Sequence, residues 1–357
     1  MKKRLMKGTE VCLALLCPVS FCSCSGIQSA LTFKIIGPKG GDSLTLVSYA
    51  DDISHVSIAD SEDVYQALFS TEYDMIIFDV DKGLDLIQKY HLNYSLARIN
   101  TYGNAYLVGL NKDPENVSVS TLSNIVTYDY ACSSYSAFSY RQSAMQNRVF
   151  KYINGFDQET DLYDRVFDNL ADEYQYLLAS DSEKVDYAIL PEPYASRLIK
   201  ADSSYSLMYS ITSKYKDKTT SADVGEEGYA HYPQTGLFIS SRLNDSDDRS
   251  TVGLVDNFFE SYDNMEISLQ RNNGSRVSDY IDAADRDKTY DPADYFGDSA
   301  DGLYTALSGN LNPNGVNALG FCSYKVDLSG WYLDAASDSL GLVNSLFNEK
   351  LLSKYYN

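Results

Sequence analysis

Histidine, tryptophan and basic side chains are all scarce in this chain of 357 residues. The chain has three His and one Trp, and 29 Lys and Arg stand against 50 Asp and Glu, so the formal net charge is −21. This acidic excess excludes a general nucleic-acid binder, because contacts to phosphate groups need a basic face. It also disfavours electrostatic docking onto an anionic bilayer.

Motifs of catalysis and metal binding are absent as well. The three histidines show no metal-ligand spacing with Cys or with one another. The chain has no G-x-S-x-G motif and no Gly-rich Lys motif of the kind that binds phosphate. We therefore predict a protein that is not an enzyme, with no catalytic residue, no metal and no cofactor.

Long apolar runs are missing too, with one short exception near the start. The apolar segment 11–19 follows a basic start, a pattern typical of a secretory signal peptide. It is too short to span a bilayer, and no later stretch approaches 18 apolar residues. Because residues 1–23 carry four basic side chains and one acidic one, a net charge of +3, the rest of the chain carries −24. We expect a signal peptide over 1–23 and a linker over 24–31.

Cysteine is concentrated in this leader, which holds Cys12, Cys17, Cys22 and Cys24 of the six in the chain. A signal that ends in small residues before a Cys resembles a bacterial lipobox. Cys24 follows Ser23, whereas Cys22 follows the bulky Phe21, so we predict that Cys24 is lipidated. A diacylated Cys would anchor the protein to a membrane without a spanning helix; the alternative is an ordinary secretory signal. Cys132 and Cys322 form either a disulfide or, as we favour for so long a chain, two free buried thiols.

One sequence pattern occurs twice, about 110 residues apart. A helical segment is followed by an Asp, by four apolar residues and then by a polar or Pro-containing loop, first at 74–78 and again at 186–190. Continuous apolar strands of this kind are buried on both faces of a sheet. The repetition predicts an α/β protein with two similarly built lobes. The length of the chain agrees, because it suffices for roughly two domains.

The remaining pattern predicts how the two lobes are connected. A strand over 105–110 leads out of the first lobe and a strand over 235–239 leads back, so two crossover segments would form a hinge. We expect lobe I over 32–108 and 235–357, and lobe II over 109–234. Further expected elements are strands over 32–36, 55–58 and 124–128, helices over 44–49, 61–68, 137–153, 172–178, 254–262 and 340–355, and a polar loop over 215–229.

Several segments resemble one family. The segment 185–195, VDYAILPEPYA, is similar to the aDaaVlPEPla stretch of the solute-binding proteins of ABC importers, in the nitrate, sulfonate, taurine and thiamine-precursor branch. The segment 100–108, NTYGNAYLV, resembles the family's ntwGnlyLv stretch, and 73–78, 232–239 and 312–317 resemble further parts of it. The segment 78–81, FDVD, departs from the Pro-Thr-Asn type of loop in many relatives, which leaves the class of ligand open.

The resemblance implies a type II periplasmic-binding fold, two lobes that close on a small-molecule solute. The partners would be an ABC permease and its ATPase, with the protein a monomer outside the cytoplasm, held at the cell membrane by its lipid anchor. Two alternatives stay open. One is an enzyme on the same fold, such as a relative of pyrimidine or thiamine-precursor synthesis, against which the export signal and the few His and Cys in loops argue. The other is a surface lipoprotein that binds a protein partner, which an exposed aromatic patch would favour.

Ligands of open α/β sheets bind beyond the carboxyl ends of the strands, often at helix N-termini. This rule and the resemblance select the candidate ligand-binding residues Gly40, Gly41, Asp42, Asp79, Thr101, Tyr102, Asn104, Tyr130, Ser133, Ser134, Glu192 and Gln234. Each also has a purely structural interpretation. These are a βα turn at 38–43, helix capping by Asp79 or Asp81, a hairpin turn through Gly103, an N-cap at 133–134 and a helix start at the prolines beside Glu192.

The charge of the ligand follows from what surrounds these positions. Only Lys39 lies near a predicted binding loop, whereas an anionic ligand would need a cation in the site. We therefore expect a neutral or aromatic heterocyclic ligand that stacks on Tyr102, Tyr130 or Tyr135.

Overall fold

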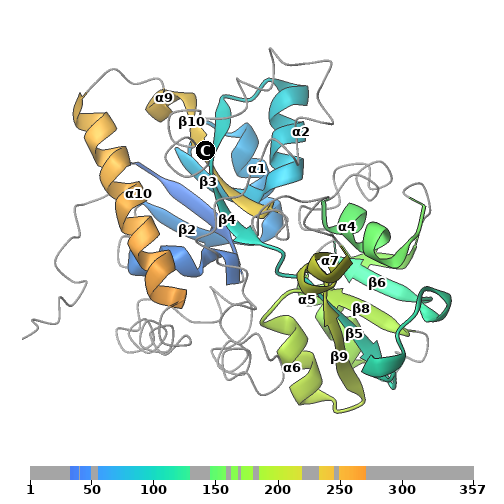
Figure 1. Ribbon diagram of the computed structural model, residues 1–357. Helices are drawn as coiled ribbons and strands as arrows, with labels where there is room; N and C mark the ends of the chain where they lie inside the picture. Colours follow the sequence, from blue (N-terminus) through green and yellow to red (C-terminus); the bar gives the residue numbers. More distant parts are fainter. Residues whose placement is uncertain are drawn as a thin grey trace, which may run out of the picture. The chain divides into compact units, whose positions relative to one another are not determined.

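The computed structural model describes residues 33–39, 41–49, 55–128, 145–157, 162–167, 170–179, 185–218, 233–244 and 249–270. Within these ranges the chain is a mixed α/β protein with two five-stranded sheets, each flanked by helices (Figure 1). The predicted fold class is therefore confirmed. The predictions for the leader, Cys24, Gly40, Tyr130, Cys132, Ser133, Ser134, Tyr135, 312–317, Cys322 and 340–355 lie outside the described residues.

The first sheet has the strand order β2-β1-β3-β10-β4. Its strands are β1 (Ile35–Pro38), β2 (Val56–Ala59), β3 (Met75–Asp79), β4 (Tyr94–Tyr102) and β10 (Pro233–Ser240). β1 pairs in parallel with β2 and with β3. β10 returns from the second half of the chain and lies antiparallel between β3 and β4. The predicted return strand therefore fills a central place in this sheet.

The second sheet has the order β7-β6-β8-β5-β9. Its strands are β5 (Tyr106–Leu110), β6 (Ile125–Tyr128), β7 (Tyr163–Phe167), β8 (Tyr187–Leu190) and β9 (Tyr205–Ser210). β6 pairs in parallel with β7 and β8, and β5 lies antiparallel between β8 and β9. Both sheets thus share one topology, in which the fourth strand is antiparallel. The expected boundary between the lobes, after residue 108, runs through β5, which lies wholly in the second sheet.

We call each sheet with its helices a lobe. The first lobe contains η2 (Gly41–Tyr49), α1 (Ser61–Phe69), α2 (Val80–Tyr90), α9 (Ser241–Asn244) and α10 (Arg249–Gln270). The second lobe contains η3 (Pro114–Asn116), η4 (Val119–Thr121), α4 (Met145–Asn154), α5 (Leu170–Leu178), α6 (Tyr194–Ala201) and α7 (Ile211–Lys218).

Two local predictions differ from the structure. The helix expected at 44–49 is a 3-10 helix that begins earlier, at Gly41. Residues 215–218, which we expected in a polar loop, form the end of α7. Here the N–H of Ser213 donates to Ser210 Oγ at 3.3 Å, which satisfies an N-terminal donor of the helix. The Lys residues that follow are good helix formers, so polarity alone did not indicate a loop.

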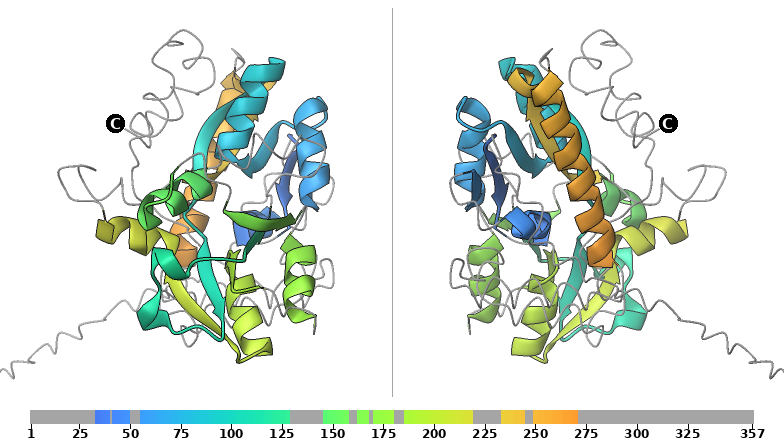
Figure 2. Two further views of the ribbon diagram at one scale, coloured as in Figure 1. Left: turned by 90° about the vertical axis from the view of Figure 1, so that its right-hand side faces the viewer. Right: turned by 90° about the vertical axis from the view of Figure 1, so that its left-hand side faces the viewer.

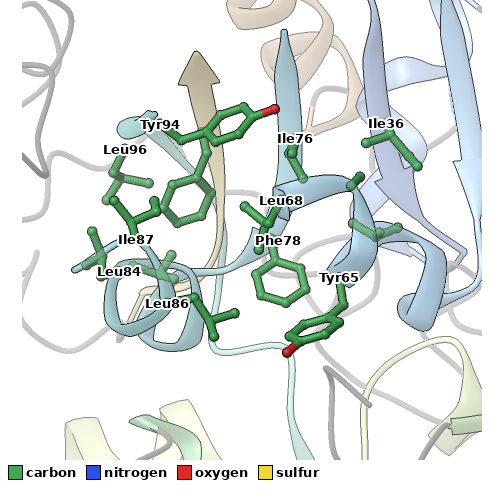
Figure 3. Packing of buried hydrophobic residues seen from close by; sticks show 14 of the residues in the cluster. Ile36, Tyr65, Leu68, Ile76, Phe78, Leu84, Leu86, Ile87, Tyr94 and Leu96 are labelled. Atoms are coloured by element: carbon green, nitrogen blue, oxygen red, sulfur yellow. The ribbon is translucent and has the colours of Figure 1, made fainter. Parts of the chain in front are cut away.

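The core of the first lobe lies on both faces of its sheet, because successive strand residues point to opposite sides. On one face, Ile76 and Phe78 of β3 pack against α1 and α2 (Figure 3). Phe238 of β10 belongs to the same cluster. On the other face, Met75 and Ile77 belong to a cluster that includes residues of α10, which runs along this lobe in both views of Figure 2.

The second lobe repeats this arrangement. A cluster that includes Val126, Ala188 and Leu190 of the sheet contains residues of α5 and α6. A second cluster, on the opposite face, contains Ile125 and Ile189 together with residues of α4. Burial on both faces explains why the repeated strands are apolar throughout rather than alternating.

The Asp that opens each repeated pattern has a structural role. Asp74 accepts a hydrogen bond from Lys34 N–H at 2.9 Å and is paired with Arg242. Asp186 accepts from Ser123 Oγ at 3.0 Å and from Asn124 Nδ2 at 2.9 Å. Each Asp therefore fastens the start of a buried strand to other segments of its own lobe.

Candidate functional site

The carboxyl ends of the parallel strands define one edge in each sheet, and one short segment joins the two edges. β4 ends at Tyr102 and β5 begins at Tyr106. β5 is antiparallel to β8 and β9, so its start lies beside the ends of both, with Tyr106 opposite Leu190 and Ser210. Residues 103–105 therefore link the carboxyl edge of the first sheet to that of the second. Open α/β sheets bind their ligands at this edge.

A buried carboxyl group lies at the first edge. Asp42 follows β1, and its Oδ1 accepts hydrogen bonds from Thr101 Oγ1 at 2.9 Å and Thr235 Oγ1 at 3.3 Å. The two threonine hydroxyls are 2.6 Å apart. Among the described residues, Asp42 Oδ2 accepts no hydrogen bond. The structure thus brings together two predicted site residues, Asp42 and Thr101, and adds Thr235, which sequence reasoning missed.

The electrostatics of Asp42 follow from this setting. Burial raises the pKa of Asp42 from the ordinary value of 3.8 to about 6, although the hydrogen bonds from Thr101 and Thr235 act in the opposite direction. Desolvation penalises the charged form, whereas donors to the carboxylate favour it. Asp42 is therefore a carboxyl group that can change its charge in mildly acidic conditions.

A second layer of polar side chains supports Asp42. Asn100 Nδ2 donates to the Asp42 carbonyl oxygen at 2.9 Å and to Thr235 Oγ1 at 3.1 Å. The hydroxyl of Tyr262, from α10, donates to Asn100 Oδ1 and accepts from Thr45 Oγ1, the latter at 2.8 Å. All of these residues are buried. The network thereby connects β4, β10, η2 and α10 beneath the edge.

The second polar cluster lies where the chain crosses between the lobes. Asn104 N–H donates to Gln234 Oε1 at 2.5 Å, and Gln234 Nε2 donates to the Asn104 carbonyl at 3.2 Å. Asn104 also exchanges hydrogen bonds with Glu192, from Glu192 N–H to Asn104 Oδ1 at 2.7 Å and from Asn104 Nδ2 to the Glu192 carbonyl at 3.1 Å. Three predicted site residues therefore meet at the crossover segments.

Gly103, beside this cluster, does not form the hairpin turn that was one interpretation of the sequence. β4 and β5 belong to different sheets, so residues 103–105 are a crossover. Gly103 has a φ of 61°, in the left-handed region that glycine adopts without strain. Its carbonyl accepts from Thr212 Oγ1 at 3.0 Å, and the carbonyl of Ala105 accepts from Ile211 N–H at 3.0 Å. The start of α7 thus holds this crossover in place.

Two of the predicted acids bond to the helix that follows them. Asp79 is the N-cap of α2, and its Oδ1 accepts from Lys82 N–H at 2.8 Å. Glu192 precedes α6 and accepts from Ser196 N–H at 3.0 Å and Ser196 Oγ at 2.9 Å. Of the two acids that could cap this helix, Asp79 and Asp81, Asp79 holds the position immediately before the helix. Both acids satisfy N–H donors that a helix start leaves unbonded.

The remaining described candidates, and the cation Lys39, lie in different environments. Tyr102 is buried in the apolar cluster beneath α1 and α2. Lys39 pairs with Asp60 at 3.2 Å, on the surface. Sequence reasoning did not single out Lys82, a cation that is buried in the first turn of α2. Its Nζ lies 5.6 Å from the centre of the Tyr65 ring. Gly41 lies at the start of η2, next to Asp42.

Two kinds of feature are absent from the described part of the chain. It contains no group of three or more His, Cys, Asp or Glu side chains that could hold a metal ion. Among the described helices, none combines the length and the apolar character that crossing a membrane requires.

Comparison with known proteins shows which solved structures have a similar fold. No family model and no curated protein matches the chain. Among solved structures, it is similar to an ABC transporter from Parabacteroides distasonis, at 17% identity and a TM-score of 0.52 over 90% of this chain and 94% of that one. It is also similar to the ligand binding component of an ABC-type import system from Staphylococcus aureus, solved with zinc bound, at 10% identity and a TM-score of 0.52 over 90% and 98%.

A third similar structure, from Methylobacillus flagellatus, is named as the periplasmic sulfonate-binding protein of a sulfonate ABC transporter. It has 10% identity and a TM-score of 0.51 over 90% of this chain and 94% of that one. At identities this low the likeness concerns the fold. The chain has the two-lobed fold of periplasmic binding proteins.

Proposed function

We propose that this protein is the extracytoplasmic solute-binding component of an ABC importer. It captures a small molecule between its two lobes and delivers it to a permease, without catalysing a reaction. The proposal rests chiefly on one observation, that residues 103–105 join the carboxyl edges of two sheets of the same topology. Ligand contacts from both edges would then favour a closed arrangement of the lobes over an open one.

The chemistry of the edges supports binding rather than catalysis. The Asp42 carboxyl group and the Thr101 hydroxyl are hydrogen-bonded to each other, and the side-chain amides of Asn104 and Gln234 bond to backbone groups, an arrangement that positions groups for recognition. The three similar structures all come from ABC transport systems, which agrees with this role. The permease, its ATPase and a monomeric state belong to the same proposal.

We further propose that the mature protein is anchored to the cell membrane through a lipid on Cys24. Support comes from the basic and apolar leader and from Ser23 before that cysteine. The test is to express the full chain with Cys24→Ser, and with Cys22→Ser as the matched control. Loss of membrane association and of fatty-acid labelling in the first variant alone would support Cys24. Unchanged labelling in the Cys24 variant would contradict it.

The binding function is tested with the purified mature chain. A ligand that binds only the folded state raises the melting temperature in proportion to the logarithm of its excess over Kd. We expect one class of small solute to give such a shift in a broad thermal-shift panel, and native mass spectrometry to detect a co-purified molecule. The absence of both would overturn the proposal.

The crossover cluster gives a second test of the function. Asn104→Ala changes a residue that takes part in four hydrogen bonds, two between its backbone and the Gln234 side chain and two between its side chain and the Glu192 backbone. Only the two made by the side chain are lost directly, so the fold should persist while the affinity falls about tenfold, because the lobes are no longer held in register. Asn116→Ala, at an exposed position, is the control. Equal affinities in the two variants would exclude this cluster from the site.

A further inference from the structure

The second lobe contains a carboxyl group that its surroundings do not satisfy. Glu173, in the first turn of α5, is fully buried, and neither of its carboxyl oxygens has a hydrogen-bond partner among the described residues. A buried carboxyl group without partners is unfavourable in either charge state, because both the carboxylate and the neutral acid lose hydrogen bonds to water. Such a group in a folded protein calls for a specific explanation, for which an absent ion or ligand is one candidate.

The matching helix of the first lobe shows that the fold does not require an acid here. α1 and α5 each have nine residues, and each follows the edge strand of its sheet. Their sequences, SEDVYQALF and LADEYQYLL, agree at four positions, Asp63 with Asp172, Tyr65 with Tyr174, Gln66 with Gln175 and Leu68 with Leu177. At the position of Glu173, α1 carries Val64, which is fully buried in the apolar core.

The place of Glu173 in the fold puts its carboxyl group near the binding edge. Leu177, one helical turn further on, packs in the apolar cluster of the second sheet, so Glu173 shares that face. Side chains of a helix tilt toward its N-terminus. α5 begins shortly after β7 ends, so its N-terminus lies at the carboxyl edge of the sheet. The Glu173 side chain is therefore directed to the edge at which ligands of this fold class bind.

Two described arginines of this lobe lie over aromatic rings. The Arg197 guanidinium lies over the rings of Tyr174 and Tyr194, at 4.6 and 5.1 Å from their centres. Arg165 lies over Phe167, 4.3 Å from the ring centre. Burial, with no contribution from a neighbouring charge, raises the pKa of Glu173 well above its ordinary value. None of the described residues therefore supplies a positive partner.

We propose that Glu173 is the second-lobe contact for a cationic nitrogen group of the captured solute, an ammonium, amidinium or guanidinium with at least two N–H donors. The inference rests on the proposed function and specifies its ligand class. Two N–H groups satisfy both unpartnered oxygens at once, which a hydrogen-bond acceptor on the ligand cannot do. A sulfonate or nitrate has no N–H donor to offer these oxygens, and the ionised form of Glu173 would repel it.

The experiment measures binding of defined probes to the mature protein and two variants at neutral pH. The cationic probes are agmatine and putrescine, the anionic probes are ethanesulfonate and nitrate, and uracil is the neutral probe. We expect a cationic probe to stabilise the natural protein. Glu173→Gln, which keeps the shape but not the charge, should weaken its binding about 30-fold or more. Asp172→Asn, at the exposed neighbouring acid, should change the affinity less than about twofold, since exposed charges contribute little.

A further variant separates binding from folding. Glu173→Val restores the residue type of the matching helix, so it should fold normally and fail to bind the cation. Equal cation affinity in the natural protein and in Glu173→Gln would overturn the inference, as would the absence of binding by either cationic probe. Stabilisation by an anionic or neutral probe alone would overturn the cationic ligand class and leave the solute-binding function standing. No shift with any probe, together with no co-purified solute, would count against both.

Discussion

The two sheets have the same strand order, but the buried acids of the two lobes, Asp42 and Glu173, differ in their hydrogen bonds. In the first lobe, Asp42 accepts hydrogen bonds from Thr101 and Thr235, and Asn100 and Tyr262 support this arrangement. In the second lobe, Glu173 is also buried and has no hydrogen-bond partner in the part of the chain that the structure describes. Because the topology is shared, the difference comes from individual side chains. Positions at which the two lobes depart from each other are therefore where a specific ligand contact is to be sought.

What the lobes share is the way they secure their strands and helices. Asp74 and Asp186 fasten equivalent strands, and Asp79 and Glu192 bond to the helices that follow them. These acids have protein partners and contribute to the fold. The comparison between satisfied and unsatisfied acids can be tested through stability.

The largest expected effect is the loss of the network beneath Asp42. Asn100→Ala removes hydrogen bonds to the Asp42 carbonyl, Thr235 and Tyr262 and leaves buried polar groups unbonded. We expect the free energy of unfolding to fall by about 3 to 4 kcal/mol. Chemical denaturation measures it, with the exposed Asn116→Ala as control. A loss under about 1 kcal/mol would show that the network does not secure the first lobe.

The next effect concerns pH. The pKa of Asp42 is raised from 3.8 to about 6, so the folded state binds a proton more tightly than the unfolded state does. This contribution to stability is fully present below pH 4 and is lost as the pH rises through 6, about 2 to 3 kcal/mol in all. Asp42→Asn should abolish that part of the pH dependence in denaturation series between pH 4 and 7. A profile unchanged by the substitution would contradict the role of burial.

Removing the charge of Glu173 should raise the free energy of unfolding, whereas removing the network residue Asn100 should lower it. Its pKa is also raised, so its contribution to stability is lost as the pH rises, whereas glutamine stays neutral throughout. At neutral pH and without ligand, Glu173→Gln should therefore stabilise the protein, by about 1 kcal/mol. The exposed Glu115→Gln serves as control. A marked destabilisation would indicate that Glu173 has a structural partner after all.

The smallest effect distinguishes two caps within the first lobe. Asp79 accepts a hydrogen bond from Lys82 N–H, whereas Asp60, the N-cap of α1, makes no side-chain hydrogen bond to its helix. Asp79→Ala should cost about 1 kcal/mol and Asp60→Ala only a few tenths. Thermal denaturation of both variants measures the difference. Equal costs would remove capping as the role of Asp79.

Sequence reasoning predicted the α/β class and the paired lobes because those signals are local. The apolar strand after Asp74 and its repeat after Asp186 need no knowledge of distant residues. The network around Asp42 could not be foreseen in the same way, because Thr235 joins it only once β10 lies between β3 and β4. Likewise the burial of Tyr102 depends on the helices packed above it.

For Glu173 a signal was present but was not used. An alignment of 61–69 with 170–178 places it opposite Val64 and shows an acid where the other helix has an apolar residue. The general lesson concerns internal repeats. Comparing the two copies residue by residue separates what the fold needs from what one copy has acquired.

The central position of β10 has a consequence for biosynthesis. β10 is the only strand among the described residues that pairs with both β3 and β4, and it is made after every strand of the second sheet. A growing chain can therefore complete the second lobe first. Until β10 is made, β3 and β4 have unpaired edges, which favour aggregation. A chain cut before Pro233 would leave the first lobe permanently in that state. If the protein is exported, a chaperone would have to protect the unpaired edges of β3 and β4 from other chains until β10 is made.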